Sequence, residues 1–267
     1  MKTFLDTATR AAHMAGEIMR QNLGTLSSTE VDAKQASDFV TRVDRESEDA
    51  IVSLIKSEYP DHFILAEEGT KDLSSDGYRW IIDPLDGTTN YIHNYPVFAV
   101  SIALEYRGEC ILGVVYDPTR DEFFHSEQGK GAFLNGNPLG VSTLTDLSRC
   151  LITTGFPFKQ RHYLDKYLEV FKRVFNRTSD IRRAGAAALD FAYLAAGRCD
   201  GFFELGLAPW DIAAGSVMIK EAGGIITDFS GGDDYLWTGN VVAGTEVTHP
   251  QLLKEVQAVF GSDSGLT

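Results

Sequence analysis

The chain has 267 residues, of which 43% are hydrophobic, and this composition is that of a folded protein with a buried core rather than of a disordered chain. Its 38 acidic and 24 basic residues give a formal net charge of −14, which opposes non-specific binding to nucleic acid and is compatible with binding of divalent cations. Residues 1–21 mix acids and bases, unlike a secretory leader, and no apolar run reaches membrane-spanning length, so we expect a cytoplasmic protein with no membrane partner. The three cysteines form no CxxC pair, so we expect reduced thiols.

The first half of the chain combines two helices with a run of strands. Apolar residues recur at helical spacing over residues 3–22, and again over residues 44–59, after which Pro60 ends the pattern. Short strand-like segments follow at residues 62–67, 79–83, 98–106, 110–117 and 122–127. An Asn-Gly pair within residues 134–138 predicts a hairpin. Consecutive strands of this kind predict an antiparallel sheet, so we assign residues 1–144 to an α+β half that carries most of the candidate metal ligands.

Strands and helices alternate after about residue 145. Strand-like segments occupy residues 150–155, 200–205, 224–229 and 240–244. Helical segments occupy residues 162–175, 185–197, 209–222 and 249–260. This alternation predicts an α/β half over residues 145–267. Because no linker rich in Pro, Gly or Ser separates the halves, we expect one cooperative catalytic unit with a cleft at their junction.

The segment WIIDPLDGTTN, residues 80–90, places two carboxylates three positions apart beside an apolar strand. We expect Asp83 at the carboxyl end of the strand, with Pro84 fixing the next φ angle and Asp86 turning back toward the same point. Two carboxylates placed in this way can share a cation. Asp-Gly and Pro are also ordinary turn residues, so this segment alone leaves a purely structural interpretation open.

The same segment supplies neutral oxygens and amides beside the carboxylates. The turn exposes the Leu85 carbonyl, and the N–H groups around Gly87 and Thr88 begin a helix that can face an anion. Oxygen ligands without a nearby Cys or His cluster favour Mg²⁺ over zinc. The sequence therefore predicts a metal site that adjoins a phosphate site.

Further acids stand where strands end or helices begin. Glu67 and Glu68 follow a hydrophobic strand, Asp44 stands at a helix start, and Asp211 lies in the first turn of another helix. Each has a plain structural explanation, because Asp44 and Asp211 complement helix dipoles and the two glutamates suit a solvated loop. Spacing in the sequence leaves open whether these acids converge with the aspartate pair.

Two long segments resemble a known family. DPLDGTTN at residues 83–90 and PWDIAAGSVMIKEAGG at residues 209–224 are similar to the two signature motifs of the inositol monophosphatase family of Mg²⁺-dependent, lithium-sensitive phosphatases. The resemblance covers nearly the whole chain and is especially marked to bacterial SuhB-type members. The chain departs from the family's pattern at Gly69 and Ala186, where hydroxyl side chains are usual, and this leaves the choice of polyol open.

The resemblance implies a fold and an activity. The fold is a five-layered αβαβα sandwich of the sugar-phosphatase type, of mixed α+β and α/β class, assembled as a homodimer. The activity is hydrolysis of inositol 1-phosphate to myo-inositol and phosphate by a water molecule that the metal activates. Two to three Mg²⁺ ions are implied per site, with Mn²⁺ as a substitute.

The resemblance also implies the metal ligands. Glu67, Asp83 and the Leu85 carbonyl would hold one Mg²⁺ ion. Asp83, Asp86 and Asp211 would hold a second ion, and a third, weaker ion would lean on Glu67.

Catalytic and substrate-binding residues are implied in the same way. The catalytic residues would be Asp44, Glu67 and Thr88, with Thr88 and Asp44 positioning or deprotonating the attacking water. Backbone amides of Gly87 and Thr88 would receive the phosphate. The contacts to substrate hydroxyls would come from Glu204, Asp211 and the backbone near Ala187. An aspartate nucleophile within the same motif is the rival mechanism.

The sequence leaves the substrate and an additional role open. Fructose 1,6-bisphosphatase, 3′-phosphoadenosine 5′-phosphatase and histidinol phosphatase are the alternatives of the same class. A bisphosphate needs a second cationic pocket, for which the candidates are Lys159, Arg161, Arg182 and Arg183. The resemblance to SuhB-type relatives also suggests a non-catalytic association with RNA or RNA polymerase. The mildly basic segment 156–173 bears on that role, but its Tyr, Leu and Phe positions predict a helix packing face.

Overall fold

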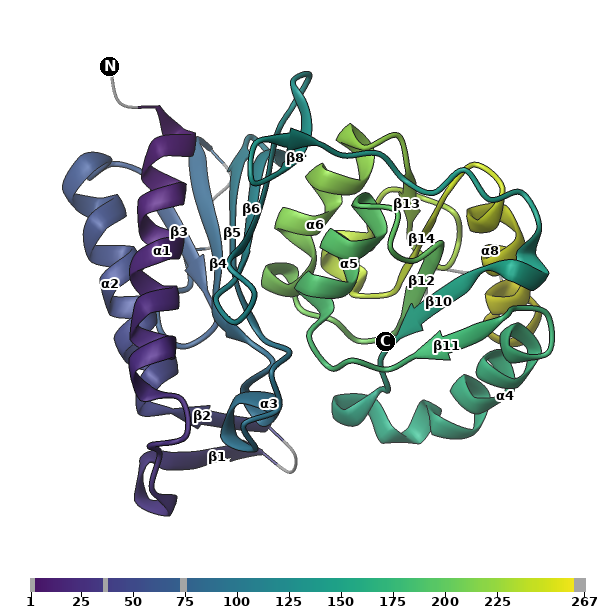
Figure 1. Ribbon diagram of the computed structural model, residues 1–267, viewed down its shortest axis with the longest axis horizontal. Helices are drawn as coiled ribbons and strands as arrows, with labels where there is room; N and C mark the ends of the chain where they lie inside the picture. The colour runs from purple at the N-terminus through teal and green to yellow at the C-terminus, as the bar shows by residue number, and fades with distance from the viewer. Residues whose placement is uncertain (1–2, 36–37, 73–75, 262–267) are drawn as a thin grey trace.

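The computed structural model describes residues 3–35, 38–72 and 76–261, and its elements stack in five layers (Figure 1). Two sheets, of seven and five strands, alternate with three pairs of helices. From one side to the other these pairs are α1 (Phe4–Asn22) with α2 (Arg42–Glu58), α5 (Ala187–Ala195) with α6 (Pro209–Glu221), and α4 (Leu164–Phe175) with α8 (Thr248–Phe260). The predicted αβαβα sandwich of mixed α/β class is confirmed.

Helices α1 and α2 form where the apolar spacing predicts them. The Thr3 side chain caps α1 by accepting a hydrogen bond from the Asp6 N–H at 3.1 Å. Helix α2 begins at Arg42, two residues before the predicted start, because Thr41 caps it. Asp44 is therefore the third residue of the helix, and its carboxylate accepts the Thr41 N–H at 2.9 Å.

The large sheet holds seven strands in the order of the chain. They are β3 (Phe63–Ala66), β4 (Tyr78–Asp86), β5 (Ala99–Tyr106), β6 (Glu109–Asp117), β7 (Glu122–Glu127), β8 (Gly131–Leu134) and β9 (Asn137–Pro138). Strands β4 to β9 are antiparallel as predicted, and Asn135 and Gly136 turn the last hairpin with positive φ angles. The prediction is wrong for β3, which pairs with β4 in parallel. The connection from β3 to β4 is longer than a hairpin loop and returns the chain to the same end of the sheet.

Strand β4 runs on to Asp86 instead of ending at Asp83, because it contains a β-bulge. Asp83 pairs with Ser101 and Asp86 pairs with Ala99, so β4 takes three steps where β5 takes two. In a regular strand, residues three apart point to opposite faces of the sheet. The extra residue cancels this alternation, so both carboxylates reach the same place. Pro84 signals a turn in the sequence, but a bulge also accommodates a residue that donates no hydrogen bond.

The second sheet has the strand order β11-β10-β12-β14-β13. Its strands are β10 (Leu151–Thr154), β11 (Asp180–Arg182), β12 (Gly201–Glu204), β13 (Ile225–Thr227) and β14 (Val241–Gly244). The first three strands in this order are parallel, as expected of an α/β layer, whereas β14 runs antiparallel to both β12 and β13. Strand β11 was not predicted, because it is short and only partly buried.

Helix α4 contradicts one prediction about the basic segment. Its buried residues are Tyr167, Val170 and Val174. Leu164 and Leu168, which were predicted to belong to the packing face, are 41% and 44% exposed. The helix is apolar on two sides, so periodicity alone did not decide which side packs inward.

Several short elements complete the chain. They are a ribbon of β1 (Val31–Gln35) and β2 (Asp38–Thr41), helices α3 (Thr88–Ile92) and α7 (Tyr235–Thr238), and the 3₁₀ turns η1 (Ser28–Glu30), η2 (Leu147–Arg149) and η3 (Phe158–Tyr163). The ribbon was not predicted, since its segment carries few apolar residues, and it extends beyond the edge of the sandwich below α3 (Figure 1). Within the described residues, no helix combines the length and apolarity needed to span a bilayer.

Helix α6 packs closely between the two sheets and so joins the two halves. A Cβ atom added at Gly113 of β6 would lie 2.3 Å from the Ala214 carbonyl oxygen, and one at Gly215 would lie 2.3 Å from Phe191 Cβ. Only glycine permits these approaches. One hydrophobic cluster accordingly contains residues of both sheets and of helices α5 and α6. The close packing holds the first turn of α6 beside the end of β4.

Candidate active site

Three carboxylates from the two halves converge at the end of β4. Asp83 and Asp86 come from the bulge, and Asp211 comes from the first turn of α6. Each offers an oxygen atom, and these atoms all lie within 4.8 Å of one another. Asp83 is 2% exposed and Asp86 is 8% exposed. The structure thus brings together three of the five predicted metal ligands.

Backbone N–H groups hold all three carboxylates in place. The pairs are Leu85 N with Asp83 Oδ1 at 2.9 Å, Ala188 N with Asp86 Oδ2 at 2.7 Å, and Ala208 N with Asp211 Oδ2 at 2.7 Å. Each side chain keeps acceptor capacity beyond the bond that orients it. The carboxylates are therefore fixed before any ligand arrives.

The electrostatics of this group favour a bound cation. Burial raises the pKa of Asp83 well above its ordinary value, and the charges of Glu67 and Asp86 raise it further. Burial and the charge of Glu67 raise the pKa of Asp211 to about 6. A divalent cation removes this repulsion, and an all-oxygen donor set suits Mg²⁺ or Mn²⁺. The residues present fit the metal that the sequence predicts.

The two remaining predicted ligands lie at the border of the group. Glu67 directly follows β3 and lines the same cavity as Asp86, but it does not belong to the set of three close carboxylates. The Leu85 carbonyl lies 3.1 Å from Thr88 Oγ1, whose single hydrogen is shared between a bond to this carbonyl and one to Asp44 Oδ1. A carbonyl oxygen has a second lone pair, so this bond leaves room for one more partner.

Asp44 and Thr88 form a buried hydrogen-bonded pair beside the carboxylates. Thr88 Oγ1 lies 2.9 Å from Asp44 Oδ1, and Asp44 is fully buried. Burial raises the pKa of Asp44 to about 6, although hydrogen bonds from Thr41 and Thr88 act in the opposite direction. The side chain is thus mostly ionised at neutral pH and close to the pKa that suits a general base.

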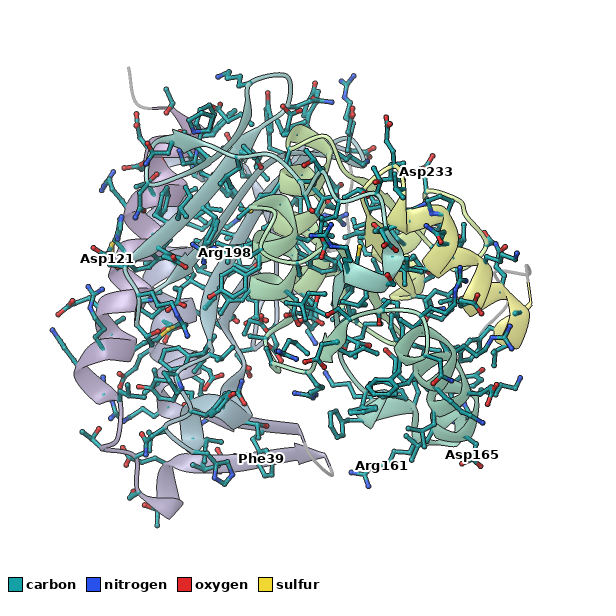
Figure 2. The ribbon with its side chains drawn as sticks, turned by 45° about the vertical axis from the view of Figure 1, so that its right-hand side comes forward. Phe39, Asp121, Arg161, Asp165, Arg198 and Asp233 are labelled. Atoms are coloured by element: carbon teal, nitrogen blue, oxygen red, sulfur yellow. The ribbon has the colours of Figure 1, made fainter. Side chains whose placement is uncertain are left out.

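A cavity of about 430 Å³ opens beside Thr88 of this pair. Its lining includes Glu67, Asp86, Gly87, Thr88, Thr89, Asn90, Lys159 and Arg183. Gly87 has a φ of 93°, and a Cβ atom there would lie 2.9 Å from the Val97 carbonyl oxygen. The first N–H groups of a helix lack partners within it, so those of α3 suit an anion. Phe39 of the β1–β2 ribbon also lines this cavity, and Figure 2 shows Phe39 and Arg161 along the same edge of the molecule.

A smaller cavity of about 110 Å³ adjoins the first one. The two share Asp86, Arg183 and Gly185 in their linings. The predicted substrate contacts Ala187, Glu204 and Asp211 all line the smaller cavity. The predicted phosphate and alcohol sites are therefore adjacent, at the junction of the two halves where a cleft was expected.

Sequence reasoning missed two residues that position the site. The Glu48 carboxylate accepts the Glu68 N–H at 2.7 Å and so fixes the loop that carries Glu67. The Asn90 side chain donates to the carbonyls of Val97 at 2.8 Å and Ala184 at 3.0 Å, which ties α3 to the segment before α5. A signal existed for Glu48, since it lies four residues after Asp44 on one face of α2.

Gly69 has a steric explanation. A Cβ atom at this position would lie 2.9 Å from Glu48 Oε1. The glycine therefore leaves room for the glutamate that holds the loop.

Of the four basic candidates for a second anion pocket, two reach the site. Lys159 and Arg183 line the larger cavity. Arg182 pairs with the Asp180 carboxylate, and Arg161 lines a separate apolar groove. The sequence alone did not separate these two pairs.

Comparisons with known proteins identify relatives of nearly the whole chain. A sequence model described as the inositol monophosphatase family matches residues 1–260. The chain is 47% identical over 259 residues to the Nus factor SuhB of Escherichia coli K12, covering 97% of this chain and 96% of that protein. Its fold matches the extragenic suppressor protein SuhB of Bartonella henselae with a TM-score of 0.91 at 40% identity, covering 95% and 98% of the two chains. It also matches an IMPase of Thermotoga maritima with a TM-score of 0.88 at 38% identity, covering 96% and 97%.

Proposed function

The chain belongs to the inositol monophosphatase family, and from this premise we propose that it is a Mg²⁺-dependent phosphatase that hydrolyses inositol 1-phosphate to myo-inositol and phosphate. The observation that carries the proposal is the convergence of Asp83, Asp86 and Asp211 within 4.8 Å, beside an amide-lined cavity. Residues 1–144 and 145–267 act in it as one catalytic unit, because neither half holds all three carboxylates.

In this proposal, five residues hold two to three metal ions. They are Glu67, Asp83, Asp86, Asp211 and, through its carbonyl, Leu85. When bound, Mg²⁺ supplies positive charge to the phosphoryl group and the departing alcohol and acidifies water, and Mn²⁺ can replace it. The carboxylates neutralise the cations and hold them at the end of β4.

Asp44 and Thr88 act on the attacking water. The ionised Asp44 carboxylate draws the hydroxyl hydrogen of Thr88 toward itself across 2.9 Å. The lone pairs of Thr88 Oγ1 are then turned toward the cavity, where they orient the water and accept its proton. Backbone amides of Gly87 and Thr88 hold the phosphate. Glu67 is the third catalytic residue, with Asp44 and Thr88. The alcohol half contacts Glu204, Asp211 and the backbone at Ala187.

The direct test is phosphate release from a panel of esters under a Mg²⁺ titration. We expect turnover of inositol 1-phosphate that needs Mg²⁺ and falls with added Li⁺. Fructose 1,6-bisphosphate, 3′-phosphoadenosine 5′-phosphate and histidinol phosphate are the comparison substrates. Release that persists in EDTA, or no release from inositol 1-phosphate at any Mg²⁺ concentration, contradicts the proposal.

The basic residues do not favour a bisphosphate substrate. Only Lys159 and Arg183 of the four candidates line the larger cavity. A second phosphate group carries about two negative charges, so it would need this whole pair, whose side chains line the same cavity as the amides proposed for the first phosphate. We therefore rank monoesters first.

An additional role in transcription complexes is the second candidate. It is favoured by the 47% identity to a protein named a Nus factor. The test is binding of the Asp86→Asn variant to purified RNA polymerase and to RNA at several salt concentrations. Binding equal to that of the unmodified protein supports a role separate from catalysis, and no binding by either protein contradicts it.

We also propose that the chain forms a homodimer through α4. Leu164, Leu168 and Phe175 are 41%, 44% and 54% exposed and follow one stripe of this helix. Asp165 and Lys172 flank the stripe with opposite charges, which suits an antiparallel pairing of two copies. Light scattering tests it, since Leu168→Asp should produce a monomer. A monomeric unmodified protein contradicts it.

The expected cytoplasmic location belongs to the same proposal. Cys110, Cys150 and Cys199 are free thiols in the structure, which is the usual state in a reducing compartment. Fractionation of cells that express the protein tests the location.

A further inference from the structure

The smaller cavity contains a buried acid that the proposed catalytic cycle does not use. Asp190 lies on α5, is 2% exposed, and lines this cavity together with Glu204. Within the ranges that the structure describes, neither carboxylate accepts a hydrogen bond or forms an ion pair. The acids at the end of β4, by contrast, each accept a backbone N–H. Asp190 is therefore a buried carboxylate without a donor from the described residues, and it borders the smaller cavity.

This arrangement is costly unless a donor enters the cavity. A carboxylate that is 2% exposed has lost most of its hydration, and no donor from the described residues replaces it. Burial raises the pKa of both carboxyls well above their ordinary values, and the Asp190 charge raises that of Glu204 further. Among the described residues, Arg183 is the one cation that lowers the pKa of both carboxyls. Its side chain lies over Gly185 and against the Phe158 ring. Two neighbouring hydrogen-bond donors would satisfy both acids together.

The position of the cavity connects it to the substrate. It shares Asp86, Arg183 and Gly185 with the larger cavity, so an ester whose phosphate lies near Gly87 and Thr88 extends its alcohol into it. Its volume of about 110 Å³ equals roughly three to four waters at about 30 Å³ each, enough for two neighbouring carbons with their substituents.

Helix α5 presents two groups to this space. Ala187 lies at its start, and Asp190 follows three residues later on the same face. A group that entered this space would meet a backbone group and a carboxylate from one rigid element.

We propose that Asp190 is a specificity-determining residue that accepts a hydrogen bond from the alcohol half of the substrate, beside Glu204. The pair of acids selects phosphate esters that carry donor groups, hydroxyl or ammonium, on neighbouring carbons. This inference rests on the proposed phosphatase function and adds a second acceptor to it.

The test compares two substrates with the Asp190→Asn variant. Inositol 1-phosphate carries neighbouring hydroxyls, and phenyl phosphate carries none. We expect kcat/KM for inositol 1-phosphate to fall about 10- to 100-fold and kcat/KM for phenyl phosphate to stay within about twofold. The reason is that removing an acceptor slows only those substrates that carry a hydrogen-bond donor. Asp61→Asn, which alters an exposed acid in the turn after α2, is the matched control and should change neither value.

Other outcomes overturn the inference. Equal losses on both substrates, or a lower unfolding temperature that accounts for them, assign Asp190 a structural role. No change on either substrate shows that the carboxylate makes no contact with the alcohol. Glycerol 1-phosphate, which carries only hydroxyl donors, and 2-aminoethyl phosphate, which carries only an ammonium donor, separate the two donor types when they are assayed in parallel.

A binding measurement separates this inference from the function on which it rests. Titration of myo-inositol in the presence of Mg²⁺ and phosphate reports on the cavity without turnover. If the unmodified protein hydrolyses neither ester, the proposed function fails. Weaker myo-inositol binding by Asp190→Asn then still supports the contact, and unchanged binding overturns it.

Discussion

Acids from the two halves of the molecule face one site, but they are held in different ways. Asp83 and Asp86 of the large sheet, and Asp44 beside them, accept backbone N–H groups that fix their orientation. Asp190 and Glu204 of the second half accept no hydrogen bond from the residues that the structure describes. Carboxylates that the backbone already orients suit a metal ion that binds in every catalytic cycle. Carboxylates with free acceptor atoms suit the recognition of one substrate alcohol among several. The fixed acids, which include Asp211 of the second half, are thus organised for the phosphate and its cations, and the two open acids are organised for the alcohol.

The largest expected effect comes from removing one fixed charge. Asp86→Asn should lower phosphate release about 1,000-fold or more at saturating Mg²⁺, because an amide cannot supply the charge that the cations need. The amide oxygen can still accept the Ala188 N–H, so the unfolding temperature should stay within a few degrees. Turnover comparable to that of the unmodified protein would remove Asp86 from the metal site.

A smaller loss should follow from the general base. Asp44→Asn should lower kcat about 100-fold and leave KM within about twofold, because Asp44 acts on the water through Thr88 and does not bind the substrate. Steady-state kinetics on inositol 1-phosphate measures both values. A rise in KM with unchanged kcat would show instead that Asp44 contributes to substrate binding.

The second half should respond differently. Glu204→Gln should lower kcat/KM for inositol 1-phosphate about 10-fold, since an open acceptor for the alcohol is weakened. The Mg²⁺ concentration at half-maximal activity should stay the same, because the cations are held by the other acids. A large shift in that concentration would show that the two groups of acids do not work separately.

The smallest effect concerns pH and the metal. The pKa of Asp211 is about 6 in the folded protein against an ordinary 3.8, so the folded, metal-free state binds this proton more tightly than the unfolded chain. The free energy of unfolding should therefore fall as the pH rises from about 4 through 6. Mg²⁺ binds the ionised form, so it should raise the unfolding temperature by a few degrees at pH 7.5 and much less at pH 5. Calorimetry at both pH values, with and without Mg²⁺, measures this difference, and an equal gain at both would contradict it.

The amino-acid sequence predicted more of the helices and strands than of the contacts between side chains at the candidate site. Helices α1 and α2 and most strands followed from periodicity, and the family motifs indicated which acids to compare. The bulge in β4 did not follow, because Pro84 is equally compatible with a turn, and only the pairing with β5 shows where the extra residue lies. Asp190 carried no signal, since an acid in the first turn of a helix is ordinary. Its significance depends on the cavity that Asp190 and Glu204 both line, which exists only after both elements are packed.

The hydrogen bond from the Ala188 N–H to Asp86 joins residues from opposite halves of the chain. During synthesis the ribosome releases the β4 aspartates long before α5 and α6, so a nascent chain carries these acids without the donor that orients one of them or the third carboxylate at Asp211. The ion site is therefore complete only after α5 and α6 have docked, and a chain that ends before them lacks both the Ala188 donor and the Asp211 carboxylate.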